Sequence, residues 1–370
     1  MIGFLPEERL ANVPVACRDQ HELCFYLHDA MVSLLKGADE VRASTLNVTF
    51  ETSEELDCFV KKNDPIGYFL DRNETDIARR IALNQVTPAL FGDFLHFIYE
   101  TLSCLERRKF VVAFALLRKP MQQNLLFASW MLADETAFFE DFRQSPADHM
   151  EEHKFPIAKR IKIFEAVLSK VEHHGLLDAS LIHEIIYNKE LPRGFAPLFA
   201  KANHLVTSRG QLTRTEDMNL NFIFKNPADN DVYESVYFGL SYLLWYALLV
   251  QIALFSRMRA VEDSFTRWMT ISTMATFHAL FVRGSSPLGT MLGKELGEFL
   301  KCPFCKRKIT ITRGMTGRFF LTQRVHCKAC GNDHDFPLFW LLSQVDWSVT
   351  SSESAKDRAK LSGLFREPTT

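Results

Sequence analysis

Two Cys-x-x-Cys pairs constrain the fold of this chain more than any other feature. Cys302 and Cys305 form the first pair, and Cys327 and Cys330 form the second after a gap of 21 residues. Two thiolates two residues apart can reach one ion from a tight turn, and a second such turn completes a tetrahedron. The spacing therefore predicts a Zn²⁺ site. A four-cysteine site is structural, because it leaves no coordination position open for water.

The segment between the cysteine pairs has the composition of a β-hairpin. Residues 308–312 (KITIT) and 318–325 (RFFLTQRV) are rich in residues that favour strands, and the intervening 313–317 (RGMTG) offers two glycines for a turn. The sequence therefore predicts a small β-hairpin zinc ribbon within residues 290–342. The apolar run 335–342 (DFPLFWLL) is expected to dock this ribbon on the rest of the protein.

Charge is distributed unevenly along the chain. Residues 301–335 carry eight Lys/Arg and two Asp, a net charge of +6, so the remainder carries −8 within a total of −2. An acidic body with a basic end suggests that the end meets an anionic partner, and nucleic acid is the partner we expect. The candidate phosphate-binding residues are Lys306, Arg307, Lys308, Arg313, Arg318 and Arg324. Phe319 and Phe320 lie among them as candidate stacking faces for single strands.

Two other interpretations of the basic ribbon stay open. It could be a staple for the C-terminal part of the chain, with its cations only keeping it in solution. It could also dock a protein partner. The sequence does not indicate the oligomeric state.

The most apolar segment of the chain, residues 236–255, contains 20 residues without a charge. That length suffices to cross a bilayer, but it also suits the central helix of a helical bundle. A span oriented by its flanking charges would export the first 235 residues, which contain lone thiols and no signal-like start. The core helix is therefore the interpretation we favour. We expect a cytoplasmic protein without a membrane segment.

The rest of residues 1–289 indicates a multi-helix body. Its predicted features include a helix from Asp19 that stops at Gly37, a short strand or extended arm at 45–50, helices begun by Pro88, Pro120 and Pro156, an end at Gly175, helices at 178–189 and 196–205, and long helices at 232–256 and 259–282. A break at 284–289, a short helix at 290–300 and a disordered tail at 348–370 complete the prediction. The fold class is thus mainly α, with the zinc ribbon at the end.

Two histidine motifs in the body raise the possibility of an enzyme. His149-Met-Glu-Glu-His153 fits the inverted zinc-protease pattern, in which two histidines share one helical face. Arg143 and His149 have the R-x5-H spacing of helical-bundle nucleases, although Pro146 interrupts the interval. The polar setting of both motifs favours a solvated loop. We assign no catalytic residues.

Residues 116–142 (LLRKPMQQNLLFASWMLADETAFFEDF) resemble uncharacterised bacterial helical proteins of the HEPN type. Ala202-Asn203-His204 fits the same pattern, while Gln122 stands where such proteins often have Glu. The resemblance implies a helical bundle and, in some members, RNA cleavage or defence against foreign nucleic acid. On this alternative, Arg118 or Arg143 would act with His149 or His204.

Overall fold

The computed structural model describes residues 2–173, 175–221, 230–259, 261–282, 294 and 296–343. The helices of its first half are α1 (Glu7–Leu10), η1 (Val15–Cys17), α2 (Arg18–Glu40), α3 (Ser53–Lys62), α4 (Pro65–Asp71), α5 (Thr75–Glu106), α6 (Phe110–Lys119), η2 (Pro120–Asn124), α7 (Leu125–Ala133), α8 (Glu135–Gln144), α9 (Pro146–His149) and η3 (Glu152–Lys154). Those of the second half are α10 (Ile157–Leu168), α11 (Ala179–Tyr187), α12 (Phe195–Asn203), α13 (Asp231–Met258), α14 (Asp263–Phe281), α16 (Arg313–Thr322) and α17 (Leu338–Ser343). Two strands, β1 (Arg324–His326) and β2 (Asp333–Asp335), form an antiparallel sheet. The predicted fold class is confirmed.

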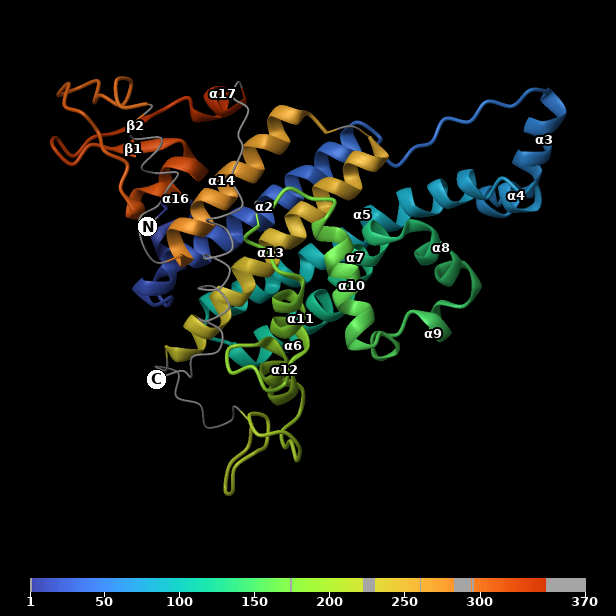
Figure 1. Ribbon diagram of the computed structural model, residues 1–370, viewed down its shortest axis with the longest axis horizontal. Coiled ribbons are helices and arrows are strands. Elements are labelled where there is room, and N and C mark those ends of the chain that lie inside the picture. The colour runs from blue at the N-terminus through green and yellow to red at the C-terminus, as the bar shows by residue number, and fades with distance from the viewer. Residues whose placement is uncertain are drawn as a thin grey trace.

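Helix α13 is the centre of the bundle, with α2, α5, α7 and α14 packed around it (Figure 1). Trp245 and Tyr246 are fully buried along it, and the Tyr246 hydroxyl lies 2.8 Å from Ser129 Oγ. By length and composition α13 is apolar enough to cross a membrane, the one such helix in the described part of the chain. Protein covers 94% of its most apolar window. A helix covered in this way has little side-chain surface left for lipid, which favours the core-helix interpretation.

Several helix boundaries differ from the sequence-based predictions. Pro88 does not start a helix but lies inside α5, because packing against α2, α4 and α6 outweighs the one main-chain hydrogen bond that a proline removes. Helix α2 continues past Gly37, and α10 ends at Leu168, before Gly175. Pro120 continues α6 through a π-helical turn instead of opening a separate helix. The predicted break at 284–289 and the tail at 348–370 lie outside the described residues, as do residues 290–293 and 295 of the helix predicted at 290–300, whose residues 296–299 form a turn.

The predicted hairpin of 308–312 with 318–325 is wrong. Residues 313–322 form helix α16, which packs along α14 and buries Phe319 and Phe320 completely. Gly317 sits at this contact: a Cβ there would lie 3.1 Å from Ile2 Cγ1 and 3.3 Å from Thr276 Cγ2. The sheet that does form flanks the second cysteine pair and matches Arg324 with Asp335 and His326 with Asp333. The predicted docking of 335–342 is confirmed, since Phe339 of α17 contacts Trp268 of α14.

A buried carboxylate holds the N-terminal segment against the bundle. Glu22 of α2 is fully buried and accepts hydrogen bonds from the amides of residues 2–5, at 2.7–3.1 Å. Gly3 has φ +81°, a left-handed conformation that lets the chain curl around the carboxylate. Four main-chain donors thereby share the two oxygens of one carboxylate.

Helices α3 and α4 form an arm that projects from the bundle (Figure 1). They share a small aromatic cluster with the start of α5, separate from the main core. Phe59, Tyr68 and Phe69 pack edge-on or tilted within it, at centroid distances of 5.2–5.9 Å. An extended segment, residues 45–50, connects this arm to the bundle.

Candidate metal centre

The four ribbon cysteines converge on one point. Their Sγ atoms all lie within 4.8 Å of one another, and they are the one group of metal-ligating side chains found in the described ranges. Cys302 and Cys330 are 3.6 Å apart at sulfur, as are Cys305 and Cys327. A Zn–S distance of about 2.3 Å in a tetrahedron requires sulfurs roughly 3.8 Å apart. A disulfide would bring them to about 2.05 Å. The arrangement could therefore hold a metal ion, and it fits Zn²⁺.

Each cysteine pair sits in a knuckle closed by main-chain hydrogen bonds. In the first knuckle the Cys302 amide donates to the Arg307 carbonyl, and the backbones of Lys301 and Lys308 form an isolated antiparallel β-bridge. In the second, the Cys327 amide donates to the Asn332 carbonyl, and β1 and β2 continue the pairing. The two sulfur pairs at 3.6 Å each join one knuckle to the other, so an ion would tie together segments that are 22 or 28 residues apart.

Amide groups directed at the sulfurs favour the thiolate form that a metal needs. The amides of Cys305 and Phe304 lower the pKa of the Cys302 thiol to about 7. Burial opposes ionisation of Cys327, but hydrogen bonds from the amides of Ala329 and Cys330 outweigh it and leave the pKa of that thiol below its usual value. Cys330 differs: the amide of Asn332 lowers the pKa of its thiol, but burial and hydrogen bonds with the other three sulfurs outweigh that effect and raise the pKa to about 12. One thiol in each knuckle is thus shifted toward the thiolate form.

Both knuckles turn through a residue with a left-handed backbone, directly after their second cysteine. Lys306 has φ +62° and Gly331 has φ +76°. No atom lies within 4 Å of a Cβ added at Gly331, so a side chain there would clash with nothing. Its only cost would be the strain of a left-handed backbone. That strain is about 1–2 kcal/mol for a residue other than glycine.

Gly331→Ala is therefore expected to weaken zinc binding about tenfold, the factor that about 1.4 kcal/mol of strain produces. Lys306→Gly should shift the affinity the other way, because it removes the same strain from the first knuckle. Competition with a chromophoric chelator measures both. Equal affinities for the two variants would show that the turns do not limit binding.

The six predicted phosphate-binding residues fall into two groups. Lys306, Arg307 and Lys308 are exposed on the first knuckle, where no described hydrogen bond or ion pair engages their side chains. The three arginines have intramolecular partners. Arg313 donates to the Ala279 carbonyl at 2.5 Å, Arg318 pairs with Asp333 at 2.6 Å, and Arg324 pairs with Asp335 at 3.3 Å.

The aromatic residues at the ribbon surface are not those predicted. Phe319 and Phe320 are buried in the core and cannot stack on a ligand. Phe304, inside the first Cys-x-x-Cys turn, is 64% exposed, and Phe299 before it is 74% exposed. Sequence alone offered one signal for Phe304: a side chain between two metal ligands sits at the tip of a turn, where the core is out of reach.

The body motifs do not assemble into a site among the described residues. His149 ends the four-residue α9 and His153 lies in η3, so the two histidines share no helix face. Arg143 pairs with Glu140 at 2.5 Å, and Arg118 Nε donates to Gln122 at 3.0 Å. No described interaction joins either arginine to His149 or His204.

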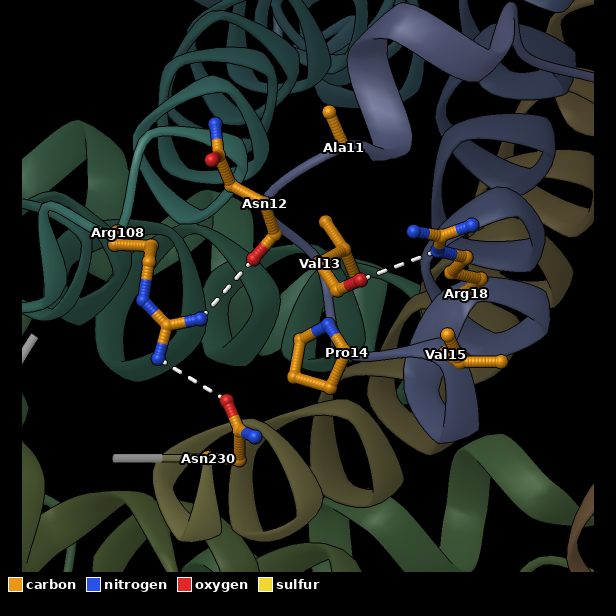
Figure 2. A pocket seen from close by; sticks show the side chains of 8 residues that line it. All are labelled: Ala11, Asn12, Val13, Pro14, Val15, Arg18, Arg108 and Asn230. Atoms are coloured by element: carbon orange, nitrogen blue, oxygen red, sulfur yellow. Dashed lines mark hydrogen bonds between the residues drawn. The ribbon is translucent and has the colours of Figure 1, made fainter. Parts of the chain in front are cut away.

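A pocket of about 540 Å³ opens between the N-terminal segment and the start of α13 (Figure 2). Its two cations are engaged: Arg108 donates to the Asn12 carbonyl and to Asn230, both at 3.1 Å, and Arg18 donates to the Val13 carbonyl at 3.2 Å. No carboxylate or histidine is among the described residues that line it. It therefore offers no acid–base pair.

Comparison of the chain with protein-family models, with curated proteins and with solved structures finds no match.

Proposed function

We propose that this protein binds single-stranded nucleic acid through its first cysteine knuckle, which a structural Zn²⁺ keeps rigid. The observation that carries the proposal is the exposed surface of that knuckle. Lys301, Lys306, Arg307 and Lys308 are exposed and lie within four positions of Phe304 in the sequence, and the ring of Phe304 is itself exposed. We name these five residues the knuckle patch. Lys301 pairs with Glu298 on the surface, at 3.5 Å.

The knuckle patch combines the two elements that sequence-tolerant binding of single strands uses. Cations attract the phosphate backbone, and an aromatic face stacks on a base, which contributes about 1–3 kcal/mol per base. Four thiolates on Zn²⁺ carry −2, which reduces the net charge of residues 301–335 from +6 to +4, so the ribbon still attracts phosphate. The acidic body disfavours contact with the strand elsewhere.

The metal has a structural role in this proposal. Four sulfur ligands leave Zn²⁺ no open position, so it activates no water and polarises no substrate. Its contribution is to fix the turn that presents Phe304 and its neighbouring cations. We place the protein in the cytoplasm, a proposal supported by its eight cysteines, none of which forms a disulfide.

Fluorescence anisotropy of labelled single-stranded RNA and of duplex DNA, at low and moderate salt, tests the proposal. The triple variant Lys306→Glu/Arg307→Glu/Lys308→Glu is expected to weaken RNA binding at least tenfold and to flatten its salt dependence by about two in the log–log slope, since each lost phosphate contact removes about 0.7. Phe304→Ala should weaken binding several-fold and leave the salt slope unchanged, because stacking releases no counterions.

A matched control carries the same change in net charge on the body. Lys61, Lys162 and Lys189 are exposed and make no described ion pair, so their triple change to Glu should leave RNA binding within about twofold. Equal losses of RNA affinity in the two triple variants would show that net charge, and not the knuckle patch, causes the effect. No binding to either nucleic acid at low salt would contradict the proposal and favour a protein partner or a staple.

A further inference from the structure

The segment that leads into the α3–α4 arm is extended and has no partner for its backbone. Residues 46–50 (LNVTF) belong to no helix or strand, and no described hydrogen bond involves their amides or carbonyls. Figure 1 shows this segment running alone from the bundle to α3. Val and Thr favour strands, so a chain of this composition with both edges free is a template for pairing.

The side chains of the segment alternate as they do in a half-buried strand. Leu46, Val48 and Phe50 occupy every second position, and Val48 and Phe50 pack against the aromatic cluster of the arm. Phe50 lies 5.1 Å from Phe59, between ring centroids. Beyond this cluster α3 leaves Leu56 and Val60 exposed, Val60 to 64%. The apolar side chains of the arm are therefore only partly covered within one chain.

We propose that two copies of this chain dimerise through these arms, with residues 46–50 paired antiparallel about a two-fold axis at Val48. This register places Val48 opposite Val48 of the second copy and Leu46 opposite its Phe50. The apolar rows of both copies then lie on one face of a two-stranded ribbon, above the aromatic clusters of both arms. The ribbon supplies hydrogen-bond partners for main-chain groups that have none within the chain.

The charges at the two ends of the segment are complementary under this symmetry. Arg42 lies six residues before Val48, and Glu54 lies six residues after it. Both are exposed, and neither has an ion-pair partner among the described residues. Antiparallel pairing brings Arg42 of each copy toward Glu54 of the other. Residues 46–50 carry no charge, so no like-charge repulsion opposes their self-association.

A second copy of the chain fits the free edge of residues 46–50 better than an unrelated strand does. The segment is self-complementary in side-chain size and in end charge, which is the requirement of an isologous interface. The contact area is small, because it involves short strands and one helix from each copy. We therefore expect a dissociation constant on the order of micromolar, typical of interfaces at the low end of the size range.

Sedimentation velocity of the full chain over a hundredfold concentration range is the first test. The wild-type protein is expected to shift from monomer to dimer. Val48→Lys places two ammonium groups at the two-fold axis and should leave the protein monomeric throughout. Thr49→Lys is the matched control, since its side chain lies on the opposite face, and it should dimerise as the wild type does. Equal thermal unfolding of the two variants would exclude loss of the arm fold as the cause.

Charge exchange tests the register. Arg42→Glu and Glu54→Arg should each weaken dimerisation at least tenfold. A mixture of the two variants should restore it, because both ends of the mixed dimer then pair opposite charges. In a Cys58→Ser background, Val48→Cys should form an intermolecular disulfide upon mild oxidation, whereas Ser44→Cys should not. A wild-type protein that is monomeric at all concentrations, or mixtures that fail to restore the dimer, would overturn the proposal.

Discussion

Cys302→Ser is expected to abolish stable zinc binding and to unfold both knuckles while the helical bundle stays folded. Cys302 is a fully buried member of the cysteine cluster, and a serine hydroxyl is a poor ligand for Zn²⁺. In small zinc domains the ion supplies roughly 10–16 kcal/mol of apparent folding free energy, so loss of one ligand removes most of the stability of the site. Zinc content should fall from one ion per chain to near zero.

Hydrogen exchange distinguishes the parts of the ribbon in this variant. Residues 300–309 and 324–335 should lose protection, because their short turns and two-stranded sheet have little core of their own. Helix α16 should retain protection, because Phe319 and Phe320 are fully buried in its contact with α14. Cys58→Ser, an exposed cysteine on α3, is the matched control and should keep its zinc. A full complement of zinc in Cys302→Ser would refute the four-cysteine assignment.

Glu22→Ala is expected to lower the free energy of unfolding by about 3–5 kcal/mol. It removes the acceptor for four main-chain amides, three of which donate to Oε1 and one to Oε2. The bond from Ile2 is buried and the other three are partly buried. A buried donor left without a partner costs about 1–3 kcal/mol, and water reaching the partly buried amides recovers part of that cost. Denaturant unfolding followed by circular dichroism measures the change.

Two further substitutions make this measurement specific to the carboxylate. Glu22→Gln keeps the shape and one acceptor oxygen, so an intermediate loss is expected, with the missing charge and second acceptor oxygen accounting for the difference from the wild type. Glu40→Ala removes an exposed carboxylate from the last turn of the same helix and should change stability by less than about 0.5 kcal/mol. A loss below about 1 kcal/mol in Glu22→Ala would show that residues 2–5 are held by other contacts.

The sequence by itself determined the features that depend on local spacing and on long apolar runs. Two cysteines two residues apart can reach one ion from a single turn, so the spacing of Cys302, Cys305, Cys327 and Cys330 indicated a group that could hold a metal ion, and their sulfurs do converge. The apolar run at 236–255 suits either a membrane or the centre of a bundle, and α13 is that centre. The amphipathic helix after Pro156 followed from its periodicity, with its beginning correct and its end too late.

Only the tertiary structure decided what the segment between the cysteine pairs would be. By composition residues 313–317 favour a turn and residues 318–322 a strand, but α14 offers a surface on which a helix buries Phe319 and Phe320, and Gly317 permits the close approach. That burial outweighs local preferences of a few tenths of a kcal/mol per residue. The same packing removed the predicted stacking residues from the surface and engaged Arg313 with α14. The knuckle patch was left exposed because a Cys-x-x-Cys turn is too short to fold its own side chains inward.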